Sequence, residues 1–200
     1  IFCYHNSTPY NILAAIETVR IVGDISFEGT NGNITINTIP LGVTLSSEVS
    51  IGSGIHTISQ TTKPLINVLE GTLKYVALEE ASCTINEAKQ CYAYEYASGW
   101  YRYNYSPLVV VNNGIIEGCK VSTSSITIDE SFEGGLKFEG DERQYIAIGA
   151  VAGYNNGTIN SCITEDNQIF GLDNNTDHNR YLGFIAAEMT EKGIIKNCYS

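Results

Sequence analysis

The sequence predicts an all-β fold in which short strands stack into a solenoid, and three observations carry this prediction. Only 16% of the 200 residues are charged, and the chain contains 19 glycines. Short apolar runs alternate with turn residues such as Asn-Asn-Gly, as small sheet segments with tight bends require. Four glycines, each followed five residues later by Cys or Val, recur at spacings of 43, 43 and 36 residues: Gly71, Gly114, Gly157 and Gly193. A recurring unit of this length indicates a solenoid or a propeller, whose units bury their apolar faces against their neighbours.

The clearest copy of the unit spans residues 145–162. An apolar run ends at the Asn-Asn-Gly of residues 155–157, and a second short strand pattern follows, with Ile159 and Cys162 as its apolar positions. Asn and Gly tolerate positive φ, so this turn fits either a hairpin or a bend between two strands of one coil. The repetition along the chain favours the bend. We expect the inward-facing residues to include Ile115, Cys119, Ile148, Val151, Ile159, Cys162, Ile194 and Cys198.

Two kinds of stretch resemble known repeats. Asn-Asn-Gly-Thr-Ile at 155–159, with the Ser-Cys pair after it, and the Asn197-Cys198 pair resemble the GLUG repeat of bacterial surface proteins. Ile-Gly-Ser-Gly-Ile-His-Thr-Ile at 51–58 is similar to a stretch common in right-handed parallel β-helices. The resemblance covers residues 12–200 and implies a right-handed parallel β-helix in a single domain, residues 1–200, of a surface or secreted protein. This architecture serves lyases, hydrolases, adhesins and inert stalks alike, so it does not fix the function.

Residues 1–18 are expected to lead into the solenoid and to cap it. Residues 12–18 form the one short helical candidate, with Asn11 as its N-cap. A cap is required because the first coil would otherwise leave its core and an open sheet edge exposed. From residue 19 onward, apolar residues at period 2, separated by Gly, Asn and Pro, predict short strands.

Residues 81–106 break the repeat and hold the most aromatic part of the chain. We expect an insertion that leaves the solenoid as a hairpin turning near Ser98-Gly99. Tyr and Trp present flat apolar faces with polar tips, which suits stacking on sugar rings or binding a protein partner. Alternatively, the insertion folds onto the flank of the solenoid and buries alternate tyrosines. The candidate binding residues are Tyr94, Tyr96, Trp100, Tyr101, Tyr103 and Tyr105.

The six cysteines fall into sets. Cys83 and Cys91 flank an eight-residue step of the insertion, and a disulfide is expected between them if the protein is exported. Cys119, Cys162 and Cys198 occupy one position of the repeat, and equivalent residues of stacked strands lie about 4.8 Å apart. We expect them to form a ladder of buried thiols that pack as small apolar groups. A straight ladder lacks the tetrahedral convergence of a metal site, so neither a metal nor a cofactor is predicted.

A second, acidic insertion is expected at residues 129–144, followed by a coil at 145–170 and a polar loop at 171–180. The last coil begins at residue 181 and shows no recognisable C-terminal cap. This pattern favours a piece excised from a longer solenoid. Alternatively, the open end binds a partner. The partner would be a second copy of the chain if the C-terminal coil mediates self-association.

The composition limits partners and location. A net charge of −11 argues against nucleic acid, which would be repelled, and against a surface for acidic polysaccharide. No run of about 18 apolar residues is present, so no membrane span is predicted. Six cysteines, few lysines and several Asn-X-Ser/Thr sequons, one of them at Asn104, indicate an extracellular or cell-surface protein.

The function that these observations favour is a non-catalytic extracellular module that acts in adhesion or as a structural spacer. Adjacent carboxylates such as Asp141-Glu142 and Glu165-Asp166 fall in predicted loops and are expected to be solvated, so no catalytic residue is assigned. One alternative is a fragment of a carbohydrate-active β-helix enzyme, a polysaccharide lyase or glycoside hydrolase. Another is a subunit of an extracellular filament that stacks through open ends. A glycan or a protein surface is the expected partner of the binding module.

Overall fold

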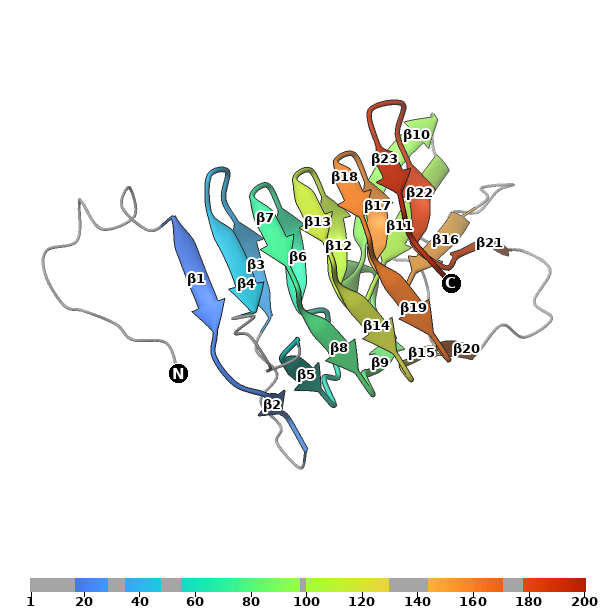
Figure 1. Cartoon of the computed structure of the whole chain (residues 1–200). Coiled ribbons are helices and arrows are strands. Elements are labelled where there is room, and N and C mark those ends of the chain that lie inside the picture. The colour runs from blue at the N-terminus through green and yellow to red at the C-terminus, as the bar shows by residue number, and fades with distance from the viewer. Residues whose placement is uncertain (1–16, 29–34, 48–54, 98–99, 130–143, 171–177) are drawn as a thin grey trace, which may run out of the picture.

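The computed structural model describes residues 17–28, 35–47, 55–97, 100–129, 144–170 and 178–200. These residues form 23 β-strands and one short 3-10 helix, η1 (Ala88–Gln90), and no α-helix occurs among them. The strands stack side by side along one axis, with β1 at one end and β22 and β23 at the other (Figure 1). The prediction of an all-β fold is therefore confirmed.

Two of the five sheets build the upper part of the stack in Figure 1. Sheet A contains, in spatial order, β1 (Thr18–Ile21), β4 (Thr44–Ser47), β7 (Thr72–Lys74), β13 (Ile115–Glu117), β18 (Thr158–Asn160) and β23 (Ile194–Lys196). Sheet C contains β3 (Ile36–Ile39), β6 (Ile66–Leu69), β12 (Val109–Asn112), β17 (Ala152–Asn155) and β22 (Ala186–Met189). Neighbouring strands of both sheets run parallel.

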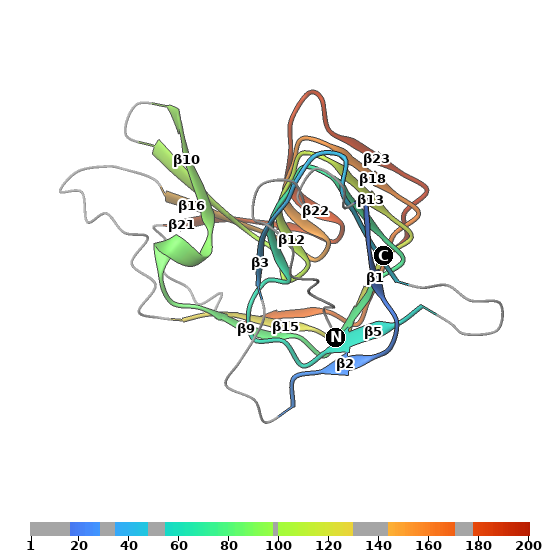
Figure 2. The same ribbon diagram turned by 90° about the vertical axis from the view of Figure 1, so that its left-hand side faces the viewer.

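The other three sheets complete each coil. Sheet B contains β2 (Ile25–Ser26), β5 (Thr57–Ser59), β8 (Ala77–Glu79), β14 (Lys120–Ser122) and β19 (Ile163–Glu165). Sheet D contains β9 (Ser82–Ile85), β15 (Ser125–Ile128) and β20 (Gln168–Phe170). Sheet E contains β10 (Tyr92–Ala97), β11 (Trp100–Tyr105), β16 (Gln144–Gly149) and β21 (His178–Gly183). Viewed along the axis, sheets D and E extend away from sheet A on the far side of sheet C (Figure 2).

The pairing register reproduces the repeat read from the sequence. Thr72 pairs with Ile115, Ile115 with Thr158 and Thr158 with Ile194. These partners are separated by 43, 43 and 36 residues (115 − 72, 158 − 115 and 194 − 158), the same spacings as those of the recurring glycines. Each turn of the chain thus adds one strand to sheet A, and the later turns also add strands to sheets D and E, which is consistent with a parallel β-solenoid.

Close stacking of backbones fixes the recurring glycines at the corner between sheets C and A. A Cβ atom on Gly114 would lie 2.0 Å from the carbonyl oxygen of Gly71, and one on Gly157 would lie 2.1 Å from that of Gly114. An ordinary C···O contact is about 3.3–3.6 Å. No side chain fits there unless the coils separate.

The next corner, between sheets A and B, uses one residue with left-handed backbone conformation in each of four successive coils. The angle φ is 54° at Tyr75, 61° at Gly118, 55° at Ser161 and 54° at Asn197. A non-glycine residue in this region costs about 1–2 kcal/mol. The parallel ladders on both sides of the corner offset this cost, because they fix where the chain must turn.

The core lies inside the coils and is almost entirely aliphatic. Leu73, Ile116 and Ile159 are in register in sheet A and are fully buried. The expectation that Ile115 and Ile194 face inward is wrong, because these side chains are 44% and 50% exposed. In β13 the second residue of the Ile-Ile pair, Ile116, is the buried one, because successive side chains point to opposite faces; in β23 Ile195 is in register with buried Ile159 but is 39% exposed. The other expected core residues are buried, apart from Cys198, which is half-buried in the last coil: Cys119, Ile148, Val151, Ile159 and Cys162.

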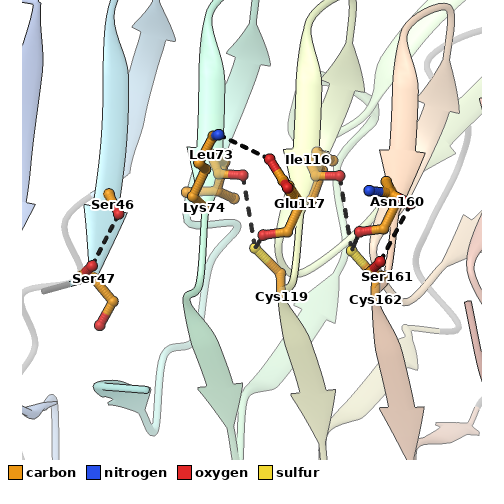
Figure 3. Close-up of polar contacts among 10 residues, drawn as sticks. All are labelled: Ser46, Ser47, Leu73, Lys74, Ile116, Glu117, Cys119, Asn160, Ser161 and Cys162. Atoms are coloured by element: carbon orange, nitrogen blue, oxygen red, sulfur yellow. Dashed lines mark hydrogen bonds and ion pairs between the residues drawn. The ribbon is translucent and has the colours of Figure 1, made fainter. Parts of the chain in front are cut away.

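The three cysteines of the repeat lie at equivalent positions of successive coils. The Cys119 thiol lies 3.9 Å from the carbonyl oxygen of Leu73 in the preceding coil, and the Cys162 thiol lies 4.0 Å from that of Ile116 (Figure 3). Cys198 makes the same contact with Ile159 at 3.9 Å. Burial raises the pKa of the Cys119 thiol well above its usual value. The geometry is that of a packed column of weak S–H donors.

A buried asparagine pair continues this stacking at the end of sheet C. Asn112 Nδ2 donates a hydrogen bond of 2.7 Å to Asn155 Oδ1, and both side chains are fully buried. Leu69 and Met189 hold the same position in the flanking coils. The pair therefore satisfies the Asn155 carbonyl oxygen within the core, whereas Asn155 Nδ2 has no hydrogen-bond partner in the described structure.

Three sequence-based boundaries differ from the structure or fall outside it. The N-terminal helical cap expected at 12–18 is not seen, because Thr18 begins β1 and residues 12–16 lie outside the described part of the chain. Most of the acidic insertion, 130–143, and most of the polar loop, 171–177, also lie outside it. Within the aromatic segment 81–106, β9 and β11 pair in parallel with strands of the following coil, whereas β10 pairs antiparallel with β11 alone.

Candidate ligand-binding groove

The hairpin predicted near Ser98-Gly99 is present and places the tyrosines on two faces. Strands β10 and β11 pair antiparallel, with a bulge between Glu95 and Ala97. Tyr92 is opposite Asn104, and Tyr94 is opposite Arg102. Paired residues share a face of a sheet, and successive residues alternate between faces. The outer face of the hairpin therefore carries these two pairs, and the inner face carries Tyr101, Tyr103 and Tyr105.

The inner tyrosines belong to the core, which corrects the prediction that they form a binding surface. Tyr103 and Tyr105 are 3% and 1% exposed, and half-buried Tyr101 packs against the same core. Burial raises the pKa of the Tyr105 hydroxyl far above its usual range. Tyr96 lies in β10 and Trp100 in β11, but their side chains lie outside the described part of the structure.

Cys83 and Cys91 are near the inner tyrosines and are free thiols in this structure. Cys83 faces the core from β9, where it pairs with Ile126, and its thiol interacts with the Tyr105 hydroxyl. Burial raises the pKa of Cys83 to about 11 and that of Cys91 to about 12. The disulfide expected for an exported protein is therefore not formed here, and both sulfurs pack as protonated thiols.

The outer face of the hairpin meets the outer face of sheet C in a cluster of three tyrosines. Ring centroids of Tyr92 and Tyr94 lie 5.9 Å apart, and each lies 5.4 Å from the ring of Tyr154 in β17. Edge-to-face and tilted arrangements at this distance are the favoured geometries of aromatic pairs. The three rings therefore hold one another in fixed orientations.

An ion pair locks the hairpin to the last described coil. The Tyr94 hydroxyl and the Arg102 guanidinium both donate to Oε1 of Glu188 in β22. The side chains of Glu188 and Arg102 are only 16% and 30% exposed. Burial, followed by the Glu188 carboxylate, raises the pKa of Tyr94. We call this group the Tyr94–Arg102–Glu188 clamp.

The groove lies beside this clamp, between η1 with the start of β10 and the outer face of sheet C. Its volume is about 670 Å³, within the range of about 300–1,000 Å³ that is usual for ligand sites. The floor is apolar and is formed by Val68, Val110 and Val111; Val110 and Val111 are only 4% and 5% exposed, so Val68 is the most accessible of the three. The walls and rim are formed by Thr35, Lys63, Pro64, Asn67, Asn86, Glu87, Lys89, Gln90, Cys91 and Tyr92.

The η1 wall is held rigidly by one glutamine. Gln90 Oε1 accepts backbone hydrogen bonds of 2.8 Å from Asn86 and Glu87, and its Nε2 donates a bond of 2.9 Å to the carbonyl oxygen of Thr84. Lys89 forms an ion pair with Glu87. Because the wall is fixed by its own hydrogen bonds, the groove exists before any ligand arrives.

Of the residues in the tyrosine cluster and the clamp, Tyr94 was predicted from the sequence, whereas Tyr92, Arg102, Tyr154 and Glu188 were not. The repeat contains the signal for two of them. Val68, Val111, Tyr154 and Glu188 are in register across sheet C, at spacings of 43, 43 and 34 residues (111 − 68, 154 − 111 and 188 − 154). Aligning the coils by register would have placed these residues in one row on the outer face.

The hairpin also buries one amide that has no partner. Asn104 is fully buried on the outer side of β11, and neither Nδ2 nor Oδ1 forms a hydrogen bond in the described structure. A buried polar group without a partner costs about 1–3 kcal/mol. Asn104 begins one of the sequons, and its burial makes the folded protein a poor acceptor for a glycan at that position.

The described residues contain no group of three His, Cys, Asp or Glu side chains that could hold a metal ion. Within the same residues, no helix has the length and apolar character needed to cross a membrane. Comparisons with protein-family models, with curated proteins and with solved structures returned no match. The groove and the clamp are therefore the features from which a function is inferred.

Proposed function

We propose that this chain is a non-catalytic, extracellular β-solenoid module that acts as an adhesive or spacing element of a surface protein. The groove between η1 and sheet C is the observation that supports it best. A stack of in-register parallel strands is a rigid support, and the clamp fixes the hairpin to it. The coil is right-handed in this proposal, as almost all parallel crossover connections are.

The carboxylates beside the groove support binding over hydrolysis. Glycoside hydrolysis requires two carboxyl groups that face each other across the scissile bond, one of them free to act as an acid. Glu87 is paired with Lys89, and Glu188 accepts from Arg102 and Tyr94. Glu188 thus has a structural role, and Glu87 forms an exposed ion pair at the rim; the groove carries an apolar floor with a polar rim, as ligand-binding clefts do.

Adhesion is tested with the purified chain on beads. Beads coated with the chain are expected to stay on a mucin-coated surface under flow, whereas beads coated with serum albumin detach. Equal detachment of both would contradict the adhesive role. The location is tested separately by treating intact expressing cells with a membrane-impermeant biotin ester. Labelling of the protein only after lysis would contradict a surface location.

Self-association through the C-terminal coil is the second candidate. The last coil exposes several large apolar side chains, which would be covered by a further coil: Leu182, Phe184, Met189, Ile194, Ile195 and Tyr199. Open strand edges pair readily with other strands. Sedimentation velocity over a wide concentration range is expected to show association that Phe184→Asp weakens. A monomer at every concentration would contradict this candidate.

A further inference from the structure

We propose that the groove binds a glycan chain, whose sugar rings stack on Tyr92 and lie along the valine floor. This inference rests on the proposed function and names the ligand class of its binding surface. Tyr92 is 37% exposed, although its ring contacts both Tyr94 and Tyr154. One face of a fixed aromatic ring is thus presented at the end of the groove, where it requires no ordering when a ligand binds.

The floor of the groove suits the apolar faces of sugar rings. Val68 and Val111 lie on β6 and β12, which are interior strands of sheet C with a hydrogen-bonded neighbour on each side. A peptide that binds by strand addition needs a free strand edge; the floor has none, whereas β10, whose first residue lines the groove, is an edge strand of sheet E, so peptide binding is an outcome that the test below must separate. Sugar rings need apolar contact on their C–H faces and polar groups at their edges. The valines supply the apolar contact. The amide of Asn67 and the ammonium groups of Lys63 and Lys89 supply the polar groups at the edges.

The charge of the rim also distinguishes ligand classes. The lining contains two lysines and one glutamate, a formal charge of +1 (2 − 1), in a chain whose net charge is −11. The remaining surface repels a polyanion such as nucleic acid. The rim itself accepts a neutral sugar or a single carboxylate. The fitting ligand is therefore an oligosaccharide with few or no acidic groups.

The test is binding of the whole chain to an array of neutral, singly acidic and polyacidic oligosaccharides, followed by titration calorimetry with the best of them. We expect Tyr92→Ala to weaken binding about tenfold. Val68→Trp, which fills the floor and leaves the tyrosines intact, is expected to abolish it. Phe170→Ala is the matched control, because Phe170 is 48% exposed and lies outside both the groove and the apolar surface of the last coil. Circular dichroism confirms that each variant is folded.

The outcomes separate this inference from the proposed function. Binding that is lost in both groove variants and kept in the control supports the glycan site. Binding that survives Val68→Trp, or an array with no bound sugar while coated beads still adhere to mucin, overturns the glycan site and leaves the adhesive function in place. Capture of unglycosylated peptides alone also overturns it. Beads that do not adhere to mucin contradict the adhesive function, whatever the array shows.

Discussion

Replacing Gly114 by Ala tests whether the stacking distance at the corner between sheets C and A is rigid. The added Cβ atom would lie 2.0 Å from the carbonyl oxygen of Gly71 and 2.8 Å from both the carbonyl carbon and oxygen of Glu70. An ordinary C···O contact is about 3.3 Å or longer, so the closest contact is too short by about 1.3 Å. All three atoms belong to the backbone. Parallel ladders hold this coil on both sides, so no flexible side chain can relieve the clash.

We expect Gly114→Ala to lower the free energy of unfolding by about 3 kcal/mol, the upper end for overpacking. Gly23→Ala is the control, because a Cβ atom there meets nothing within 4 Å. That change is expected to leave stability unchanged or to raise it by about 0.4–1 kcal/mol. Urea unfolding followed by far-ultraviolet circular dichroism measures both. If the two variants unfold within about 0.5 kcal/mol of each other, the corner relaxes easily and the reasoning is refuted.

Three further predictions concern buried polar groups. Asn104→Leu is expected to raise the free energy of unfolding by about 1 kcal/mol because it removes an unpaired buried amide. Asn112→Leu is expected to lower the free energy of unfolding by about 1–3 kcal/mol because it leaves the buried Asn155 Oδ1 without its donor. Equal effects of the two changes in urea unfolding would contradict both predictions. Burial raises the pKa of Cys83 from 9.0 to about 11, so the folded state holds this proton more tightly than the unfolded chain. The contribution of the Cys83 proton to the stability of the fold is present below pH 9 and is lost as the pH rises towards 11. In thermal melts, the melting temperature of Cys83→Val should therefore fall less over this pH range than that of the unchanged protein. Arg102→Met is expected to cost about 1–2 kcal/mol because the largely buried Glu188 carboxylate loses its cation. The double variant with Glu188→Leu should recover part of this loss, and a double variant less stable than Arg102→Met would argue against the clamp.

The repeat spacing was predictable because stacking converts sequence period directly into register. Glycines spaced by 43 residues mark strands that pair at the same 43-residue offset. The orientation of Ile115 was predicted wrongly, because two adjacent apolar residues cannot show which one faces inward. The Thr158-Ile159 pair at the same position of the next coil resolves this, since the threonine is on the outer face and the isoleucine is buried.

The clamp is harder to predict because its members come from separate coils. Arg102 and Glu188 lie 86 residues apart, and their contact requires both the hairpin register and the angle between sheets E and C. The aromatic residues of the hairpin could be identified from sequence, but not which of them remain accessible. Alternation on β11 places Tyr103 and Tyr105 in the core, whereas Tyr92, which the sequence analysis did not select, borders the groove.

The constant register of the coils sets a rule for how such a chain changes length. Residues 107–149 comprise one whole turn of 43 residues, and the two strands that their removal brings together, β6 and β17, are both partners of β12 in the same register. A gene that loses or duplicates this segment would encode a shorter or longer solenoid with every ladder intact. The turn from Thr158 to Ile194 has 36 residues instead of 43 and keeps the same register, so the segments between strands absorb differences in length. A one-residue insertion inside a strand would instead move the inward side chains that follow it in that strand to the outer face. Variation in length among genes that encode this architecture should therefore occur as whole turns or in the segments between strands.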